Sequence, residues 1–94
     1  MLTESEFYDK YLKNSDRLFA FNLLMRLESD VFYFLGAGNH NARHLWAVND
    51  PAAHIQYMKY LWKYCKKAYG YRVLSQHMKY SDILAYQKHL VPEK

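Results

Sequence analysis

The chain has 94 residues, a formal net charge of +4, and aromatic residues at 18% of its positions. This length suits one domain rather than two, and the aromatic content excludes an intrinsically disordered chain. No apolar run reaches the ~18 residues of a membrane span, and the N-terminus lacks the basic and apolar regions of a secretory signal. The single cysteine excludes an intrachain disulfide. We therefore expect one folded cytoplasmic domain over residues 1–94.

A short helix is predicted at the N-terminus. Thr3 and Glu6 have the spacing of a capping box, in which each side chain bonds to the backbone of the other residue. The helix should run from about Glu4 to Leu12 and end at the polar residues 14–16. Its apolar side would carry Phe7, Tyr8, Tyr11 and Leu12.

A longer helix is predicted from about Arg17 to Leu35. Ser15 or Asp16 can cap its start, and Gly36 stands where a left-handed glycine commonly ends a helix. Apolar side chains recur at three- and four-residue steps, as on one face of a helix. They are Ala20, Phe21, Leu24, Leu27, Val31, Phe34 and Leu35.

The third predicted helix has the clearest start. Asp50 is a favoured N-cap residue, and Pro51 follows at the first helical position, where its missing N–H is not needed. Gly70 should end this helix. Its apolar face is predicted to contain Ile55, Met58, Leu61, Trp62, Cys65, Ala68 and Tyr69.

An extended linker and a final helix are predicted after Gly70. Residues 71–74 are β-prone but have no partner strand, so we expect them to be extended. Ser81 is the expected cap of a helix from Asp82 to about Leu90, which Pro92 should stop. The predicted fold is an all-α small bundle of two long antiparallel helices, flanking short helices and a packed loop that contains a tryptophan.

The connection from Gly36 to Asn49 has fourteen residues, whereas helix–helix connections in bundles usually have ~2–8. Residues 45–48 read Leu-Trp-Ala-Val, which is too apolar for a solvated tether. We therefore expect the loop to fold back, with Trp46 docked against the second and third helices and its indole N–H donating to a carbonyl.

Polar and small residues are predicted to shape this loop. Gly36, Gly38 and Asn39 permit the positive φ angles that a tightly folded loop needs. His44 should order the loop through a hydrogen bond. With Trp46, these residues form the structural loop motif of the sequence.

A family resemblance covers the loop and the helix after it. The segment FLGAGNHNARHLWAVNDPAAHIQYMKYLWKYC resembles the core motif of the large polyvalent protein-associated domain of type eleven. Ser81-Asp82-Ile83 resembles the start of the family's closing helix, so the resemblance spans about residues 17–90. The residues that carry it in the core motif are Tyr33, Phe34, Leu35, Gly36, Gly38, Asn39, His44, Leu45, Trp46, Ala47, Ile55, Met58, Leu61 and Trp62.

This sequence departs from the family pattern in an extra N-terminal helix, a longer third helix, and Gly70-Tyr71-Arg72-Val73 in place of a linker with proline. The resemblance implies a bacterial mobile genetic element as the source: a plasmid, conjugative transposon or phage. It also implies an accessory module without established chemistry.

Three kinds of chemical site find little support in the residues. Gly36-Ala37-Gly38-Asn39 follows a helix C-terminus, whose partial charge is opposite to that of a phosphate-binding N-terminus. The spacing of His40, His44, His54, His77 and Cys65 matches no zinc pattern, and Cys65 falls on the apolar face, where a thiol is inert. We expect no enzymatic activity, no cofactor and no metal.

A basic face is predicted on the third helix. Residues 1–35 carry a net charge of −2 and residues 36–94 a net charge of +6. Lysines and tyrosines alternate on one side of this helix, where they can neutralise phosphates and stack on bases or simply cover apolar surface with their stems and rings. The candidate binding face consists of Lys59, Tyr60, Lys63, Tyr64 and Lys67.

Tyrosine-rich surfaces favour protein recognition, because tyrosine brings contact area at low entropic cost. The sequence therefore predicts a non-enzymatic module that binds an unknown protein partner. Self-association and nucleic acid binding by the basic face are the alternatives, and no membrane association is expected.

Overall fold

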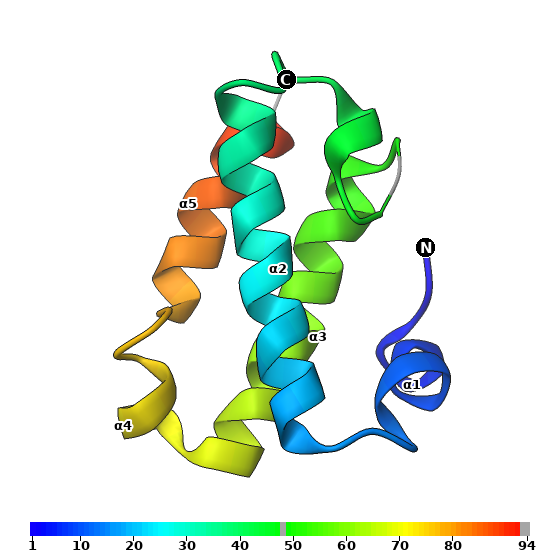
Figure 1. Cartoon of the computed structure of the whole chain (residues 1–94), viewed down its shortest axis with the longest axis vertical. Coiled ribbons are helices and arrows are strands. Elements are labelled where there is room, and N and C mark those ends of the chain that lie inside the picture. Colours follow the sequence, from blue (N-terminus) through cyan, green and yellow to red (C-terminus); the bar gives the residue numbers. More distant parts are fainter. Residues whose placement is uncertain (48, 93–94) are drawn as a thin grey trace.

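The computed structural model describes residues 1–47 and 49–92. In these residues all regular structure is helical, which confirms the predicted all-α class. Two long helices, α2 (Arg17–Leu35) and α3 (Pro51–Tyr69), run antiparallel, and α5 (Tyr80–Leu90) packs against both (Figure 1). The short helices α1 (Glu4–Phe7) and α4 (Tyr71–Leu74) lie toward the end of the bundle where α2 begins and α3 finishes.

Both long helices have the predicted bounds because the expected side chains cap them. The Asp16 carboxylate accepts from the Phe19 amide at 2.8 Å, and the Asp50 carboxylate accepts from the Ala53 amide at 3.0 Å. These bonds satisfy amides that have no partner inside the helix. The helices bury apolar stripes against each other, which include Leu24, Leu27 and Val31 from α2 and Ile55, Met58 and Leu61 from α3.

The N-terminal helix starts as predicted and then changes type. Thr3 and Glu6 form the expected capping box, with bonds of 3.0 and 3.2 Å. A π-helical segment, η1 (Tyr8–Leu12), follows α1, and it ends where the Lys13 amide donates to the Tyr8 carbonyl at 2.8 Å. A π-helical hydrogen bond joins residues that are five apart rather than four. This wider turn brings Phe7 and Leu12, which are five residues apart, to the same side, where both are buried.

Residues 71–74 form helix α4, so the predicted extended linker is wrong. Gly70 adopts a φ of 87°, and the Leu74 amide donates to the Gly70 carbonyl at 3.1 Å. This turn carries the Leu74 side chain into the core. The β propensity of residues 71–74 is a local property and does not predict such a tertiary contact.

The last helix starts earlier than predicted, at Tyr80. Its first turn is capped by Asp82, whose carboxylate accepts from the Lys79 amide at 2.8 Å, so the predicted cap at Ser81 is wrong. The hydroxyl of Tyr86 donates to the Glu28 carboxylate at 2.8 Å and thereby ties α5 to α2. Burial and this carboxylate raise the pKa of Tyr86 well above its ordinary range.

The long connection between α2 and α3 folds back on the bundle, as predicted. It contains a short 3-10 helix, η2 (Ala42–His44), that packs on α2, and Leu45 behind it is buried. Val48, part of the predicted apolar segment, lies outside the described residues. The His44 ring packs edge-on against Tyr33, with 4.9 Å between ring centroids.

The loop glycines act differently from the prediction. Gly36 has a φ of −110°, and the positive φ angles of the loop belong to Asn39, His40 and Asn49. Gly38 serves close approach instead, because a Cβ atom there would lie 2.8 Å from the Tyr33 carbonyl oxygen. The prediction of a left-handed C-cap at Gly36 is therefore wrong.

Trp46 is half-buried, and it contacts only one of the two helices predicted for it. Its ring meets Tyr11 at 5.0 Å, Phe7 at 6.2 Å and Tyr57 at 6.1 Å between centroids, so it packs on the N-terminal segment and α3 rather than on α2 and α3. The indole hydrogen bond expected of Trp46 is made by Trp62, whose N–H donates to the Met78 carbonyl at 3.0 Å.

The two tryptophans should therefore differ in their effect on stability. We expect Trp62→Ala to lower the free energy of unfolding by ~3–5 kcal/mol, because it empties a buried site. Trp46→Ala should cost less, about 1–2 kcal/mol, since part of that ring already contacts water. Urea unfolding followed by circular dichroism measures both, and an equal or larger loss for Trp46→Ala would contradict the assignment.

Candidate functional site

A groove of about 1120 Å³ runs along the C-terminal half of α3. The N-terminal segment forms one wall, and the start of α5 contributes Tyr80. Lysines and aromatic rings dominate the lining, together with a single carboxylate from Glu4. The cationic and aromatic residues are Phe7, Tyr8, Tyr60, Trp62, Lys63, Tyr64, Lys66, Lys67 and Tyr80.

Helical spacing places these side chains together. Residues three or four apart are neighbours on a helix surface, so Lys63 stands beside Lys66 and Lys67, and Tyr60 stands beside Tyr64. The Lys66 ammonium lies 5.8 Å from the centre of the Trp62 ring, and the Tyr8 and Tyr64 rings are 6.2 Å apart. The groove thus joins positive charge to a broad aromatic surface on a rigid element.

Most of the predicted binding face lines this groove. Tyr60, Lys63, Tyr64 and Lys67 are part of its wall, whereas Lys59 is half-buried and does not contribute. Sequence reasoning missed Tyr8 and Tyr80 as groove residues, because they come from other helices. Residue spacing along α3 carries no signal for these long-range neighbours.

The loop motif does not join the groove. Gly36, Gly38, Asn39 and His44 lie at the end of the bundle where α2 finishes and α3 begins. Gly38 and His44 pack around Tyr33 there, so their observed role is to shape the loop.

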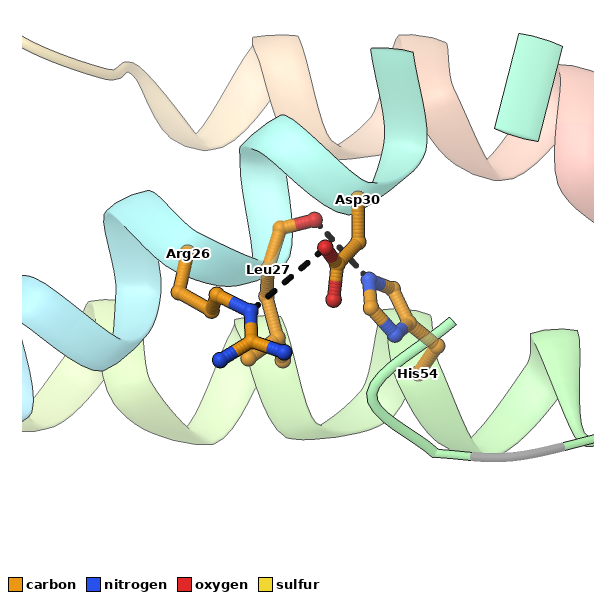
Figure 2. A network of polar contacts seen from close by, with 4 residues as sticks. All are labelled: Arg26, Leu27, Asp30 and His54. Atoms are coloured by element: carbon orange, nitrogen blue, oxygen red, sulfur yellow. Dashed lines mark hydrogen bonds and ion pairs between the residues drawn. The ribbon is translucent and has the colours of Figure 1, made fainter. Parts of the chain in front are cut away.

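A buried polar contact connects α2 to α3 near this loop. Figure 2 shows the His54 ring against the Leu27 carbonyl, with 2.9 Å between Nε2 and the oxygen. His54 is 0% exposed, and the bond is satisfied by the neutral ring with its proton on Nε2. Asp30 lies nearby, and its Oδ1 is 3.6 Å from Arg26 Nε.

Two atoms of this cluster have no hydrogen-bond partner among the described residues. They are His54 Nδ1 and Asp30 Oδ2, both buried. Burial lowers the pKa of His54 from its ordinary value of 6.5, while the bond to Leu27 and the charge of Asp30 oppose this shift. His54 was predicted neither on the apolar face of α3 nor in a binding site, because a polar residue type does not indicate complete burial.

Cys65 is fully buried on α3, as predicted from the apolar spacing. Burial raises the pKa of its thiol to about 11, so the nucleophilic thiolate is scarce at neutral pH. Within residues 1–47 and 49–92, no three His, Cys, Asp or Glu side chains are grouped to hold a metal ion.

His54 should make stability depend on pH. The unfolded chain takes up a proton near pH 6.5, whereas the folded chain takes it up only at lower pH. The contribution of neutral His54 to the free energy of unfolding is therefore complete above about pH 6.5. As the pH drops below this value, the free energy of unfolding falls by at most ~1.4 kcal/mol per pH unit.

We expect His54→Gln, which keeps an N–H donor, to be less stable but to lose this slope between about pH 7 and pH 5. Thermal unfolding across that interval provides the measurement. His89→Gln, at an exposed position, is the matched control and should keep the slope of the unmodified chain. Equal slopes for the two variants would contradict the role of His54.

No helix among the described residues has both the length and the apolar character that crossing a membrane requires.

Comparison with known proteins identifies the family. The chain matches no curated protein and no solved structure. The family model described as large polyvalent protein-associated domain 11 matches residues 17–90, which is most of the sequence. The chain therefore belongs to this family of accessory domains of polyvalent proteins.

Proposed function

We propose that this chain is a non-enzymatic protein-binding module of a bacterial mobile genetic element, and that the groove along α3 is its binding surface. The observation that carries the proposal is the lining of the groove, where aromatic rings from four elements (α1, η1, α3 and α5) meet three lysines. The family supports an accessory role, since its members are domains associated with polyvalent proteins.

The chemistry of the groove suits a protein partner. Binding energy in protein interfaces is concentrated in buried aromatic side chains set in a well-packed centre. Tyr60 and Tyr64, which are half-buried, provide such rings on the bundle's central helix, so little conformational freedom is lost on binding. The lysines at the rim would steer an acidic partner and fix its orientation.

Nucleic acid binding is the second candidate. It is favoured by Lys63, Lys66 and Lys67, because lysines neutralise phosphates and nearby rings stack on bases. Two observations make it the weaker candidate. The Glu4 carboxylate is part of the lining, and the lining contains no arginine, the commonest reader of bases.

Self-association is the third candidate. Exposed apolar side chains such as Leu18, Phe32 and Leu84 lie outside the groove. A homo-oligomer formed through them would leave the groove free, so the two surfaces can be tested separately.

A site-specific crosslinker tests the groove. We expect benzoylphenylalanine at Tyr64 to crosslink one discrete protein in a bacterial host, because Tyr64 lines the groove. The same group at Leu84, an exposed position on α5, is the matched control and should give no product of that mass. A product at Leu84 alone would move the binding surface away from the groove and contradict the proposal.

Salt dependence separates protein from nucleic acid. If DNA or RNA occupies the groove, a mobility shift at ~50 mM salt should weaken steeply as salt rises and vanish when Lys63, Lys66 and Lys67 are changed to glutamate. We expect no such shift. A shift with these two properties would replace the protein-binding proposal by the second candidate.

A further inference from the structure

The side chain of Phe7 sits in an aromatic box built by the rest of the domain. Its ring stacks on Tyr57 with 4.8 Å between centroids, meets Tyr60 at 5.7 Å, and meets Trp46 at 6.2 Å. Phe7 is 0% exposed. Because Tyr57, Tyr60 and Trp46 come from α3 and the loop before it, the box belongs to the family domain, whereas Phe7 precedes residue 17, where the family match begins.

Two of these tyrosines also hold the backbone of Leu2. The Leu2 amide donates to the Tyr57 hydroxyl at 2.8 Å, and the Tyr60 hydroxyl donates to the Leu2 carbonyl at 3.1 Å. Every residue type except proline has a backbone N–H and carbonyl, so this pair of bonds can hold any residue other than proline at that point. The box and the two hydroxyls together make a peptide-binding arrangement: a backbone clamp followed, five residues later, by a pocket for an aromatic ring.

The segment that fills the arrangement precedes the family domain in sequence and differs from it in charge. Residues 1–16 carry a net charge of −2, and residues 17–94 carry +6, so the two parts attract each other. Lys13, Asn14 and Asp16 are exposed at the junction. The π-helical turn of η1 is a rare conformation that occurs frequently at functional sites.

The box is also open to solvent at its edge. A hollow of about 420 Å³ lies beside it and is lined by Met1, Tyr11, Trp46, Tyr57 and residues of the neighbouring turn. An incoming chain can therefore touch the aromatic residues before the N-terminal segment has left.

We propose that the aromatic box is a docking site for an acidic helical segment of a partner protein, and that residues 2–12 of this chain occupy it as an intramolecular competitor. This proposal rests on the protein-binding role proposed above and names the partner's chemistry. The same segment forms one wall of the groove and Tyr60 lines both the groove and the box, so the partner would take the place of that wall when it binds. The partner presents a backbone-held residue followed by aromatic residues five and nine positions later, the spacing of Leu2, Phe7 and Tyr11 here. Binding of the partner releases the N-terminal segment.

Transfer of the segment to a separate peptide tests this. The probe is a fluorescent peptide with the sequence of residues 1–13, and the target is the full chain with Phe7→Ala and Tyr11→Ala. We expect this variant to bind the peptide at least about tenfold more tightly than the unmodified chain does, because its own segment no longer competes. A peptide that carries Phe7→Ala should bind the variant at least about tenfold more weakly than the parent peptide.

Phe32→Ala in the full chain is the matched control, because it removes an exposed phenylalanine far from the box in sequence. It should bind the peptide as weakly as the unmodified chain. A doubly substituted chain that keeps its helical circular dichroism and unfolds cooperatively, yet does not bind the peptide, would overturn the proposal.

Hydrogen exchange decides the question without substitutions. In the unmodified chain, the amides of residues 8–12 should exchange at least about tenfold faster than those of residues 24–31 in α2. Equal protection of both segments would show that the N-terminal helix is an integral part of the core and would overturn the proposal. So would a dimer in light scattering that exchanges N-terminal segments, because the occupant would then be a second copy.

The outcome is independent of the crosslinking at Tyr64. Loss of peptide binding with a persistent crosslink to a protein would remove this proposal and leave the protein-binding groove. A crosslink to nucleic acid alone would remove the proposed function, whereas the peptide transfer reports on the box itself.

Discussion

Helix α3 is the element on which the rest of the structure depends, because it packs against α1, α2, α4 and α5. A helix with so many neighbours must be apolar on most of its sides. In α3 this holds for the N-terminal half, where His54, Tyr57 and Met58 are all buried. Only its C-terminal half exposes a row of lysines, and the groove lies there. Packing requirements therefore decide where on α3 a binding surface can exist.

The sequence was sufficient to predict the long helices, because their caps are local signals. Asp16, Asp50 and Pro51 act within three residues of their own position, and α2 and α3 have the predicted bounds. The fold class followed from the same patterns. The predictions that failed depend on contacts between distant residues. Residues 71–74 are helical because Leu74 reaches the core, and Trp46 packs on the N-terminal segment because Phe7 and Tyr11 lie there.

The candidate site was predictable in part for the same reason. Four of the five residues of the predicted face come from one helix, and their spacing brings them together in the groove. Lys59 is half-buried instead and does not line the groove. The walls supplied by Tyr8 and Tyr80 depend on where η1 and α5 pack, and residue spacing along α3 does not predict this. The box around Phe7 has the same origin, since its rings come from α3 and from the loop before it, while Phe7 comes from α1.

The burial of Cys65 has a practical consequence. Thiol reagents attack the thiolate, which requires both access to solvent and loss of the proton. Neither condition holds while α3 is packed, because the side chain is 0% exposed and its pKa is raised to about 11. The rate at which a thiol reagent alkylates Cys65 therefore reports how often the core around α3 opens. Global unfolding can be followed at this native cysteine without attaching a spectroscopic label.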